Sequence, residues 1–250
     1  MMINYQERTL IVLPHLDDEF ALVPIIKKIT SSSKNKLSII FCAERNQSED
    51  LNNIRRGENI NALSSIGCAT DNIIYLNDFF KVDDLRLLDA SLNIYNFLIK
   101  FSKDHNIKQI ITLNFEGGHP DHDSLALIVQ KISDRYKNIS SFYVPAYNSR
   151  KSLVIPVSVF RPLKSQQDHF YKEIHSIFIW FDAFLIALKY RSERAAFLKL
   201  MPFIILNIFF SRSIYVSTKI DIESVDWEDS LSLRRYSATK VDIINKIEEI

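Results

Sequence analysis

The 250-residue sequence predicts an α/β fold in which a mainly parallel sheet carries helices on both faces. Five short apolar runs in residues 1–150 alternate with amphipathic helical patterns of about 12 to 20 residues, which is typical of βαβ crossovers. The length suits one sizeable domain, and no repeat, low-complexity tract or linker interrupts the pattern. The expected architecture is therefore Rossmann-like.

The predicted strands are short runs of apolar, partly β-branched residues. The first run, Thr-Leu-Ile-Val-Leu, stops at Pro14, and its uninterrupted apolar character suits a strand buried on both faces. The five predicted strands cover residues 8–14, 36–43, 72–76, 107–114 and 141–147.

The predicted helices lie between these strands and show apolar spacing of three and four residues. In the second helix, Ser48 is a plausible N-cap, acidic residues follow in the first turn, and Gly67 marks the end. The four predicted helices cover residues 19–33, 48–68, 83–105 and 121–136.

The pattern changes after residue 150. A possible strand at 153–160 contains Pro156, which favours a sheet edge, and residues 212–221 and 239–250 predict a late strand and a closing helix. The expected organisation is a Rossmann-like core over residues 1–150 and a C-terminal extension over residues 151–250, packed on the same domain.

The segment 166–210 is strongly apolar and aromatic. Charges at Asp182, at 189–194 and at Lys199, and then Pro202, interrupt it, so neither apolar run reaches the roughly 18 to 20 residues of a spanning helix. The expected structure is a buried helical cap. The alternative is that 176–210 associates with a membrane surface or a lipid-linked substrate, or makes the chain a membrane-associated interaction protein.

The formal net charge of +1 gives no reason to expect nucleic acid as a partner. Cys42 and Cys68 lie on or beside predicted buried elements, so we expect core thiols in a reducing compartment. The N-terminal residues show no apolar signal region. The expected location is the cytoplasm, with peripheral attachment to the inner membrane face as the alternative; the oligomeric state is not indicated.

The stretch Pro-His-Leu-Asp-Asp-Glu follows the first predicted strand directly and contains His15, Asp17, Asp18 and Glu19. Carboxylates this close repel one another, and they lose hydration at the end of a buried strand. A fold does not require such a cluster. A bound cation would compensate for it.

A second cluster, Gly-Gly-His-Pro-Asp-His at 117–122, follows the fourth predicted strand and holds two of the four glycines. Both clusters then fall at the carboxyl edge of the sheet, where ligands bind in such folds. Two histidines and one carboxylate would suit a catalytic zinc ion, and another carboxylate could act as a base. The same set also suits ferrous iron.

Each cluster alone has a simpler interpretation. Paired aspartates after a first strand also occur in magnesium sites of receiver-like modules, and a lone His-x-x-His is common by chance. The alternative to an enzyme is therefore a non-catalytic magnesium-binding receiver-like or sugar-binding α/β module. Such a module needs neither His15 nor the second cluster, so their occurrence at one sheet edge favours the metal-dependent enzyme.

The two motifs resemble those of the PIG-L (LmbE-like) family of zinc-dependent N-acetylglucosaminyl-phosphatidylinositol deacetylases. The resemblance covers roughly residues 8–135. Residues 55–67 are similar to the family's arginine–glutamate helix, and residues 187–193 are similar to a stretch that usually ends Tyr-x-Ser-Gln. Both of these are weaker signals than the paired motifs.

The resemblance implies roles for individual residues. His15, Asp18 and His122 would ligate zinc, and Asp17 would take a proton from the zinc-bound water. His119 would stabilise the oxyanion, with protonation of the leaving amine as a second role. In the surrounding shell, Asp121 would orient a histidine. Arg55 or Arg56 would contact substrate.

The implied reaction is hydrolysis of an N-acetyl group from an amino sugar in a glycan, glycolipid or conjugate, which releases acetate and a free amine. The chain departs from the family pattern at two positions. Leu16 stands where proline is usual, which constrains the turn less but removes no ligand. Glu193 stands where glutamine is usual, which puts contacts with substrate in doubt.

Overall fold

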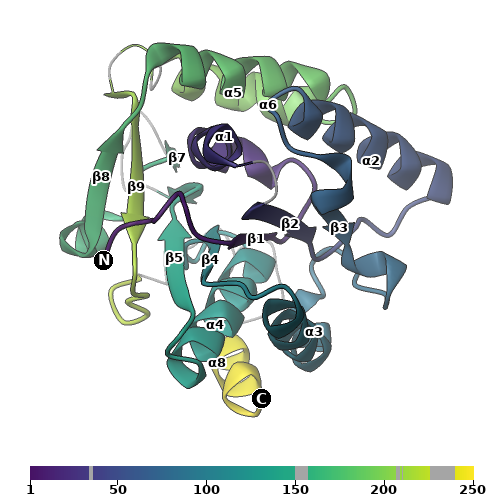
Figure 1. Ribbon diagram of the computed structural model, residues 1–250, viewed down its shortest axis with the longest axis vertical. Coiled ribbons are helices and arrows are strands. Elements are labelled where there is room, and N and C mark those ends of the chain that lie inside the picture. Colours follow the sequence, from purple (N-terminus) through teal and green to yellow (C-terminus); the bar gives the residue numbers. More distant parts are fainter. Residues whose placement is uncertain (34–35, 150–156, 207–208, 210, 226–239) are drawn as a thin grey trace.

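The computed structural model describes residues 1–33, 36–149, 157–206, 209, 211–225 and 240–250. Its centre is a seven-stranded sheet in the order β3-β2-β1-β4-β5-β9-β8 (Figure 1). The strands of this sheet are β1 (Thr9–Leu13), β2 (Leu37–Phe41), β3 (Ile73–Tyr75), β4 (Gln109–Leu113), β5 (Ser140–Val144), β8 (Phe170–Ile174) and β9 (Ser213–Ser217). A separate antiparallel pair consists of β6 (Tyr147–Ser149) and β7 (Val157–Val159).

The first five strands run parallel, and β9 and β8 join antiparallel beyond β5. In the central strand, Ile11 lies opposite Ile39 of β2 and Ile111 of β4. All five residues of β1 and of β4 are buried, as expected for strands covered on both faces. The mainly parallel α/β fold is therefore confirmed.

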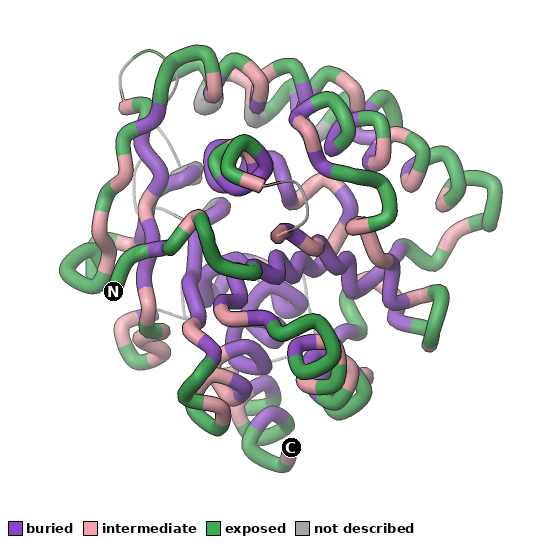
Figure 2. The backbone as a smooth tube through the Cα atoms, viewed as in Figure 1, coloured by how far each residue is buried: buried purple, intermediate pink, exposed green. Residues whose placement is uncertain are grey.

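Helices cover both faces of the sheet (Figures 1 and 2). The helices are α1 (Val23–Ser32), α2 (Glu49–Ser64), α3 (Ser91–Asp104), α4 (Pro120–Arg135), α5 (Ile177–Lys189), α6 (Arg194–Leu206) and α8 (Lys240–Glu248). One core cluster joins the sheet to α1, α2 and α5, and the other joins it to α3, α4 and α8. Cys42 and Cys68 are buried free thiols in these cores.

Two predicted helices differ from the structure at their starts. Within the predicted helix 19–33, the first turn is a 3₁₀ helix (Asp18–Leu22), and the α-helix α1 begins at Val23. The prediction of helix from residue 83 is wrong, because residues 83–86 are a loop with Leu85 at φ 68° and a 3₁₀ turn (Leu87–Ala90) precedes α3. Ser48 caps α2 as predicted, accepting a hydrogen bond from Leu51 N.

The C-terminal half contains the predicted late strand, β9, and closing helix, α8, and also β8, which the sequence did not predict. Residues 153–156 of the possible edge strand and residue 239 lie outside the described residues. The division at residue 150 stays a prediction. In the described residues, no helix combines the length and the apolarity that crossing a membrane requires.

The buried helical cap is not confirmed. Residues 177–189 and 194–206 are helical, and Trp180 and Ala183 of α5 are buried. However, Phe178 is 79% exposed and Leu198 is 70% exposed. The cap therefore covers the core with one side and presents apolar side chains with the other.

The order in which the chain adds strands to the sheet reverses between β1 and β4. From β1 the chain adds β2 and β3 on one side and then returns to add β4 and β5 on the other. Loops that leave the carboxyl ends of β1 and β4 therefore diverge over a crevice, which is where open α/β sheets bind ligands.

We predict that Ile11→Ala lowers the free energy of unfolding by about 3–4 kcal/mol, because it removes apolar volume from the fully buried central strand. Denaturant unfolding would measure this. Leu92→Ala on α3 is the control, since Leu92 is 54% exposed and its loss should cost less than about 1 kcal/mol. Equal losses would show that β1 is not the centre of the core.

Candidate metal-dependent active site

The first motif forms a tight loop between β1 and the 3₁₀ helix (Asp18–Leu22). Asp17 has φ 92°, in the left-handed region that aspartate tolerates better than most residues. Its N–H donates to the Glu19 carboxylate at 3.1 Å, and Glu19 is fully buried. Leu16, in place of the family's proline, is 3% exposed and packs in the core. The turn is thus held by buried contacts without proline.

The second motif is the start of α4. His119 is the N-cap, and its Nδ1 accepts the N–H of Asp121 at 3.2 Å. Pro120 occupies the first helical turn, where its missing N–H costs nothing. Asp123 accepts the N–H groups of Glu116 and Gly117, which holds the preceding loop against the helix. Gly117 has φ 68°, a conformation that explains glycine there.

The two motifs meet at one carboxylate oxygen. Asp18 Oδ2 lies 3.2 Å from His15 Nδ1 and 3.4 Å from His122 Nε2. The same oxygen accepts the backbone N–H of His15 at 3.0 Å. The three side chains that the sequence assigns to the metal therefore lie together, from loops more than 100 residues apart.

His119 lies beside them. Its ring centroid is 4.7 Å from that of His15 and 5.0 Å from that of His122, and one nitrogen of each ring lies within 4.8 Å of the others. A second group of potential ligands joins His15 and His119 to Asp84 and Asp121. In the described part of the chain, groups of three or more potential metal ligands occur only here.

The donor set fits a transition-metal ion. Imidazole nitrogen and carboxylate oxygen are ligands that zinc and ferrous iron accept. Here two imidazole nitrogens converge on one carboxylate oxygen at distances longer than the usual hydrogen bond of about 2.9 Å, so a single ion could be shared by all three groups.

Asp121 fixes the orientation of His15. Its Oδ2 accepts His15 Nε2–H at 2.9 Å and Leu85 N–H at 2.7 Å, and its Oδ1 accepts Leu87 N–H at 3.1 Å. With Nε2 engaged there, His15 Nδ1 turns toward Asp18. This is the arrangement in which a carboxylate sets the tautomer of a metal-binding histidine.

Asp84 is a site residue that the sequence analysis missed. Its Oδ1 lies 3.2 Å from His15 Nε2 and 3.8 Å from His119 Nε2. The loop that carries it is tied to the end of β2, because Asp84 N–H donates to Glu44 O at 2.8 Å. Its signal in the sequence is the acidic pair Asp83–Asp84 after the third predicted strand, but the apolar spacing of residues 83–105 predicts a helix there.

The surroundings shift the pKa values of Asp17, Asp18 and His119 in different directions. Burial raises the pKa of the Asp17 carboxyl well above its ordinary value, and the charge of Asp18 adds to this, whereas Arg55 opposes it. Burial opposes the charge on Asp18, but His122 and His15 outweigh it and lower its pKa. Burial and the charges of the other two histidines lower the pKa of His119 to about 3. Such divergence is typical of functional sites.

Comparison with known proteins agrees with this geometry. Residues 10–133, which contain both motifs, match the family PIG-L, described as GlcNAc-PI de-N-acetylase. The chain contains a PIG-L family domain. Comparison with curated proteins gives no significant match.

Several solved structures have the same fold, and each aligns with this chain over almost its whole length. The A40926 pseudoaglycone deacetylase Dbv21 aligns with a TM-score of 0.55 at 14% identity, over 85% of this chain and 97% of that one. A teicoplanin deacetylase in complex with teicoplanin aligns at 0.52 and 12%, over 86% and 100%. The conserved protein TT1542 from Thermus thermophilus aligns at 0.50 and 15%, over 86% and 96%. At these identities the likeness concerns the fold, and it extends beyond the PIG-L domain.

The two arginines of α2 differ in their surroundings. Arg55 is 5% exposed, donates to Leu16 O in the first motif and lies 3.0 Å from Glu193. Arg56 pairs with Glu44 and Asp78 and lies over the Tyr75 ring. Arg55 therefore lies beside the first motif, whereas Arg56 forms ion pairs with Glu44 and Asp78. A substrate contact for either arginine stays a prediction.

The contacts of Glu193 give a structural reason for a glutamate where the family usually has glutamine. Its two oxygens accept hydrogen bonds from Arg45 at 2.7 and 3.1 Å, and Oε1 also meets Arg55. Arg45 Nε in turn lies 3.7 Å from Asp84 Oδ2. A buried carboxylate between two guanidinium groups thus connects the turn after α5 to the edge of the site.

We predict that His122→Ala lowers the metal content of the purified protein from about one zinc or iron ion per chain to near zero, because His122 is one of the converging donors. Elemental analysis without added metal would measure this. His169→Ala is the control, since His169 is 48% exposed and lies outside both groups of potential ligands. Full metal content in His122→Ala would exclude the two-motif site.

We predict that Glu193→Gln lowers the free energy of unfolding by about 2 kcal/mol, because it removes the charge that accepts hydrogen bonds from Arg45 and forms an ion pair with Arg55. Denaturant unfolding would measure the loss. Asp89→Asn removes a carboxylate from the exposed Arg86–Asp89 pair and should cost less than about 0.5 kcal/mol. No difference between the two variants would contradict a structural role for Glu193.

Proposed function

We propose that the chain is a metal-dependent N-deacetylase that hydrolyses the N-acetyl group of an amino sugar. The observation that carries the proposal is the convergence of His15, Asp18 and His122 on one point, inside a PIG-L family domain. The substrate class is an N-acetylglucosamine-type glycan, glycolipid or conjugate. Zinc is the metal we propose, and ferrous iron would fit the same donors.

The bound ion would supply Lewis acidity, polarising the acetyl carbonyl and lowering the pKa of a water molecule. Asp17 is the proposed base that takes the proton from this water as its oxygen attacks the carbonyl carbon. It follows His15 by two residues, and its backbone is held by Glu19. The carbon–nitrogen bond would then break as the nitrogen takes up the proton that Asp17 had accepted, so that acetate and a free amine are released.

His119 is the proposed donor to the carbonyl oxygen as that oxygen gains negative charge. Since its Nδ1 accepts the N–H of Asp121, the ring proton is on Nε2. Nε2 lies 3.8 Å from Asp84 Oδ1, so the nitrogen that carries the proton is on the side of the ring that faces Asp84. A neutral imidazole held in one tautomer is suited to an oxyanion contact.

The receiver-like alternative is less well supported. Magnesium prefers oxygen ligands and retains water, whereas here two imidazole nitrogens lie within 3.4 Å of Asp18 Oδ2 and the His119 ring lies beside those of His15 and His122. The PIG-L match also carries a deacetylase description. We therefore favour hydrolysis over a non-catalytic magnesium-binding or sugar-binding module.

We predict that Asp17→Asn lowers the rate of acetate release by about 10²–10⁴-fold while the metal content stays unchanged, because the variant removes the proposed base and no metal ligand. Acetate release from a panel of N-acetylated amino sugars, with elemental analysis of each sample, would measure both quantities. Asp89→Asn, an exposed position, is the control. Near-normal deacetylation by Asp17→Asn would overturn the assignment of the base.

A further inference from the structure

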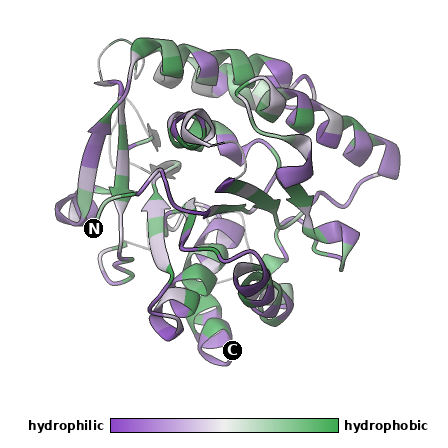
Figure 3. Ribbon diagram, in the orientation of Figure 1, coloured by the Kyte–Doolittle hydropathy of each residue, from purple (hydrophilic) through white to green (hydrophobic). Residues whose placement is uncertain are grey.

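The outer side of α5 is an exposed apolar stripe. Phe178, Phe181, Leu185 and Leu188 recur at intervals of three and four residues, and their side chains are 79, 52, 42 and 52% exposed. The opposite side of the helix, with Trp180 and Ala183, is buried against the core. The helix is therefore apolar on both sides (Figure 3), and only one side is covered.

Neighbouring segments enlarge this surface. The outer sides of α5 and α6 are mostly exposed in Figure 2, and the two helices pack against each other. Of the eighteen exposed large apolar residues in the described chain, ten lie between residues 174 and 209. We call this set the apolar face; it consists of Ile174, Ile177, Phe178, Phe181, Leu185, Leu188, Leu198, Ile205, Leu206 and Phe209. Clustering of this kind marks an interaction surface.

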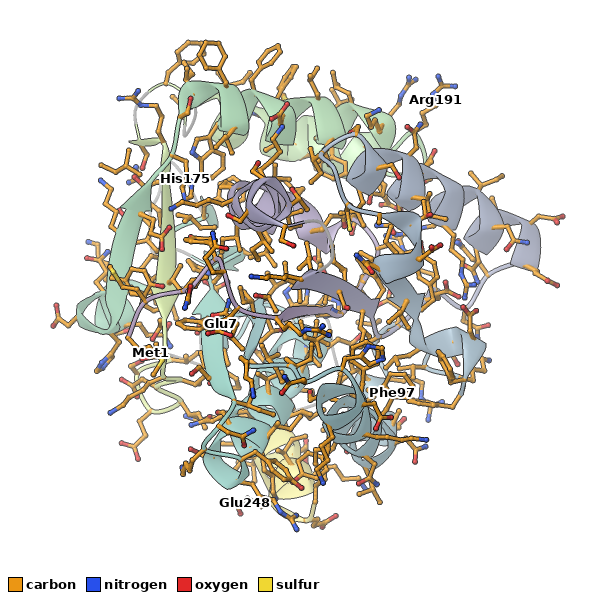
Figure 4. All side chains as sticks on the ribbon, viewed as in Figure 1. Met1, Glu7, Phe97, His175, Arg191 and Glu248 are labelled. Atoms are coloured by element: carbon orange, nitrogen blue, oxygen red, sulfur yellow. The ribbon has the colours of Figure 1, made fainter. Side chains whose placement is uncertain are left out.

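The charged side chains around the apolar face are predominantly basic. Three acidic residues of this region are neutralised, since Glu173 lies near Lys28, Asp182 pairs with Lys27, and Glu193 is buried between two arginines. A fourth, Glu58 of α2, accepts hydrogen bonds from Ser192 and from the backbone of Arg191. By contrast, exposed cations without an acidic partner among the described residues are Lys172, Arg191, Arg194 and Lys199. Figure 4 shows Arg191 projecting outward at the end of α5.

We propose that the apolar face is a docking surface for a lipid bilayer that contains anionic phospholipid. Aromatic and aliphatic side chains on one side of a helix, with basic residues beside them, are the features of helices that lie in the membrane interface. A second copy of this chain would bring the same cations together, which opposes pairing through this face. The charge thus favours a negatively charged partner with an apolar interior.

The apolar face is connected to the active site by the turn that follows α5. Tyr190 donates a hydrogen bond to the Glu19 carboxylate of the first motif, and Glu193 pairs with Arg45 and Arg55. Docking would therefore hold one edge of the site close to the bilayer surface. The proposal does not depend on the deacetylase activity, because the experiment measures binding without a sugar substrate.

The experiment is co-flotation of the purified full chain with vesicles of phosphatidylcholine containing phosphatidylglycerol, at low salt. We expect the wild type to bind, and Phe178→Gln/Phe181→Gln to bind at least about tenfold more weakly, because two aromatic side chains leave the interface. Arg191→Gln/Arg194→Gln/Lys199→Gln, vesicles of phosphatidylcholine alone, and high salt should each weaken binding by a similar factor.

The matched control is Leu92→Gln/Val241→Gln, which changes two exposed apolar residues on α3 and α8, at the other face of the sheet. This variant should bind as the wild type does, and thermal unfolding should show that all variants are folded. Failure of the wild type to bind, or an equal loss in the control, would overturn the proposal. So would sedimentation of the wild type as a dimer that Phe178→Gln/Phe181→Gln dissociates, with no vesicle binding.

Discussion

The arrangement of the site depends on one buried carboxylate, that of Asp121. It is 1% exposed and accepts hydrogen bonds from His15 on the loop after β1 and from the backbone of Leu85 and Leu87 on the loop after β3. Asp121 itself belongs to the first turn of α4, where an acidic side chain is favoured by the helix dipole. The loops that follow β1, β3 and β4 are therefore held together by one buried carboxylate.

The core of the fold could be predicted because its signals are local. Short runs rich in aliphatic, β-branched residues, such as those within 8–14 and 107–114, predict strands from their own composition, and the motifs that follow them indicate the sheet edge. His15, Asp18 and His122 could be proposed as metal ligands from the sequence because the motifs that carry them are compact and resemble those of the family. Asp84 could not, since its loop has no regular structure and is fixed by a backbone pairing with Glu44 that no sequence period reveals.

The C-terminal region was harder to predict for a related reason. β8, with the sequence Phe-Tyr-Lys-Glu-Ile, lacks clear alternation, and its pairing is antiparallel with β9 about 40 residues later. The partners of Glu193 likewise come from β2–α2 and from α2, far away in sequence. Contacts of this kind are decided by tertiary packing, whereas the apolar composition of 176–210 showed only that helices were expected there.

The connection between Tyr190 and the first motif gives the C-terminal helices a role in the site. Tyr190 is buried, donates to Glu19, and receives a hydrogen bond from Asn59 Nδ2 at 2.8 Å, while Tyr75 donates to Asn59 Oδ1 at 2.8 Å. Glu19 in turn accepts the N–H of Asp17, whose left-handed backbone needs such support. The conformation of the proposed base is thus stabilised from α5 and α2 as well as from β1.

The position of Tyr190 at the end of α5 requires apolar residues on the side of that helix that faces the core. It does not require Phe178 and Phe181, which lie exposed on the outer side. Their exposure to water is unfavourable for the isolated chain, and covering them by a bilayer would remove that cost without disturbing the hydrogen bonds that support Asp17.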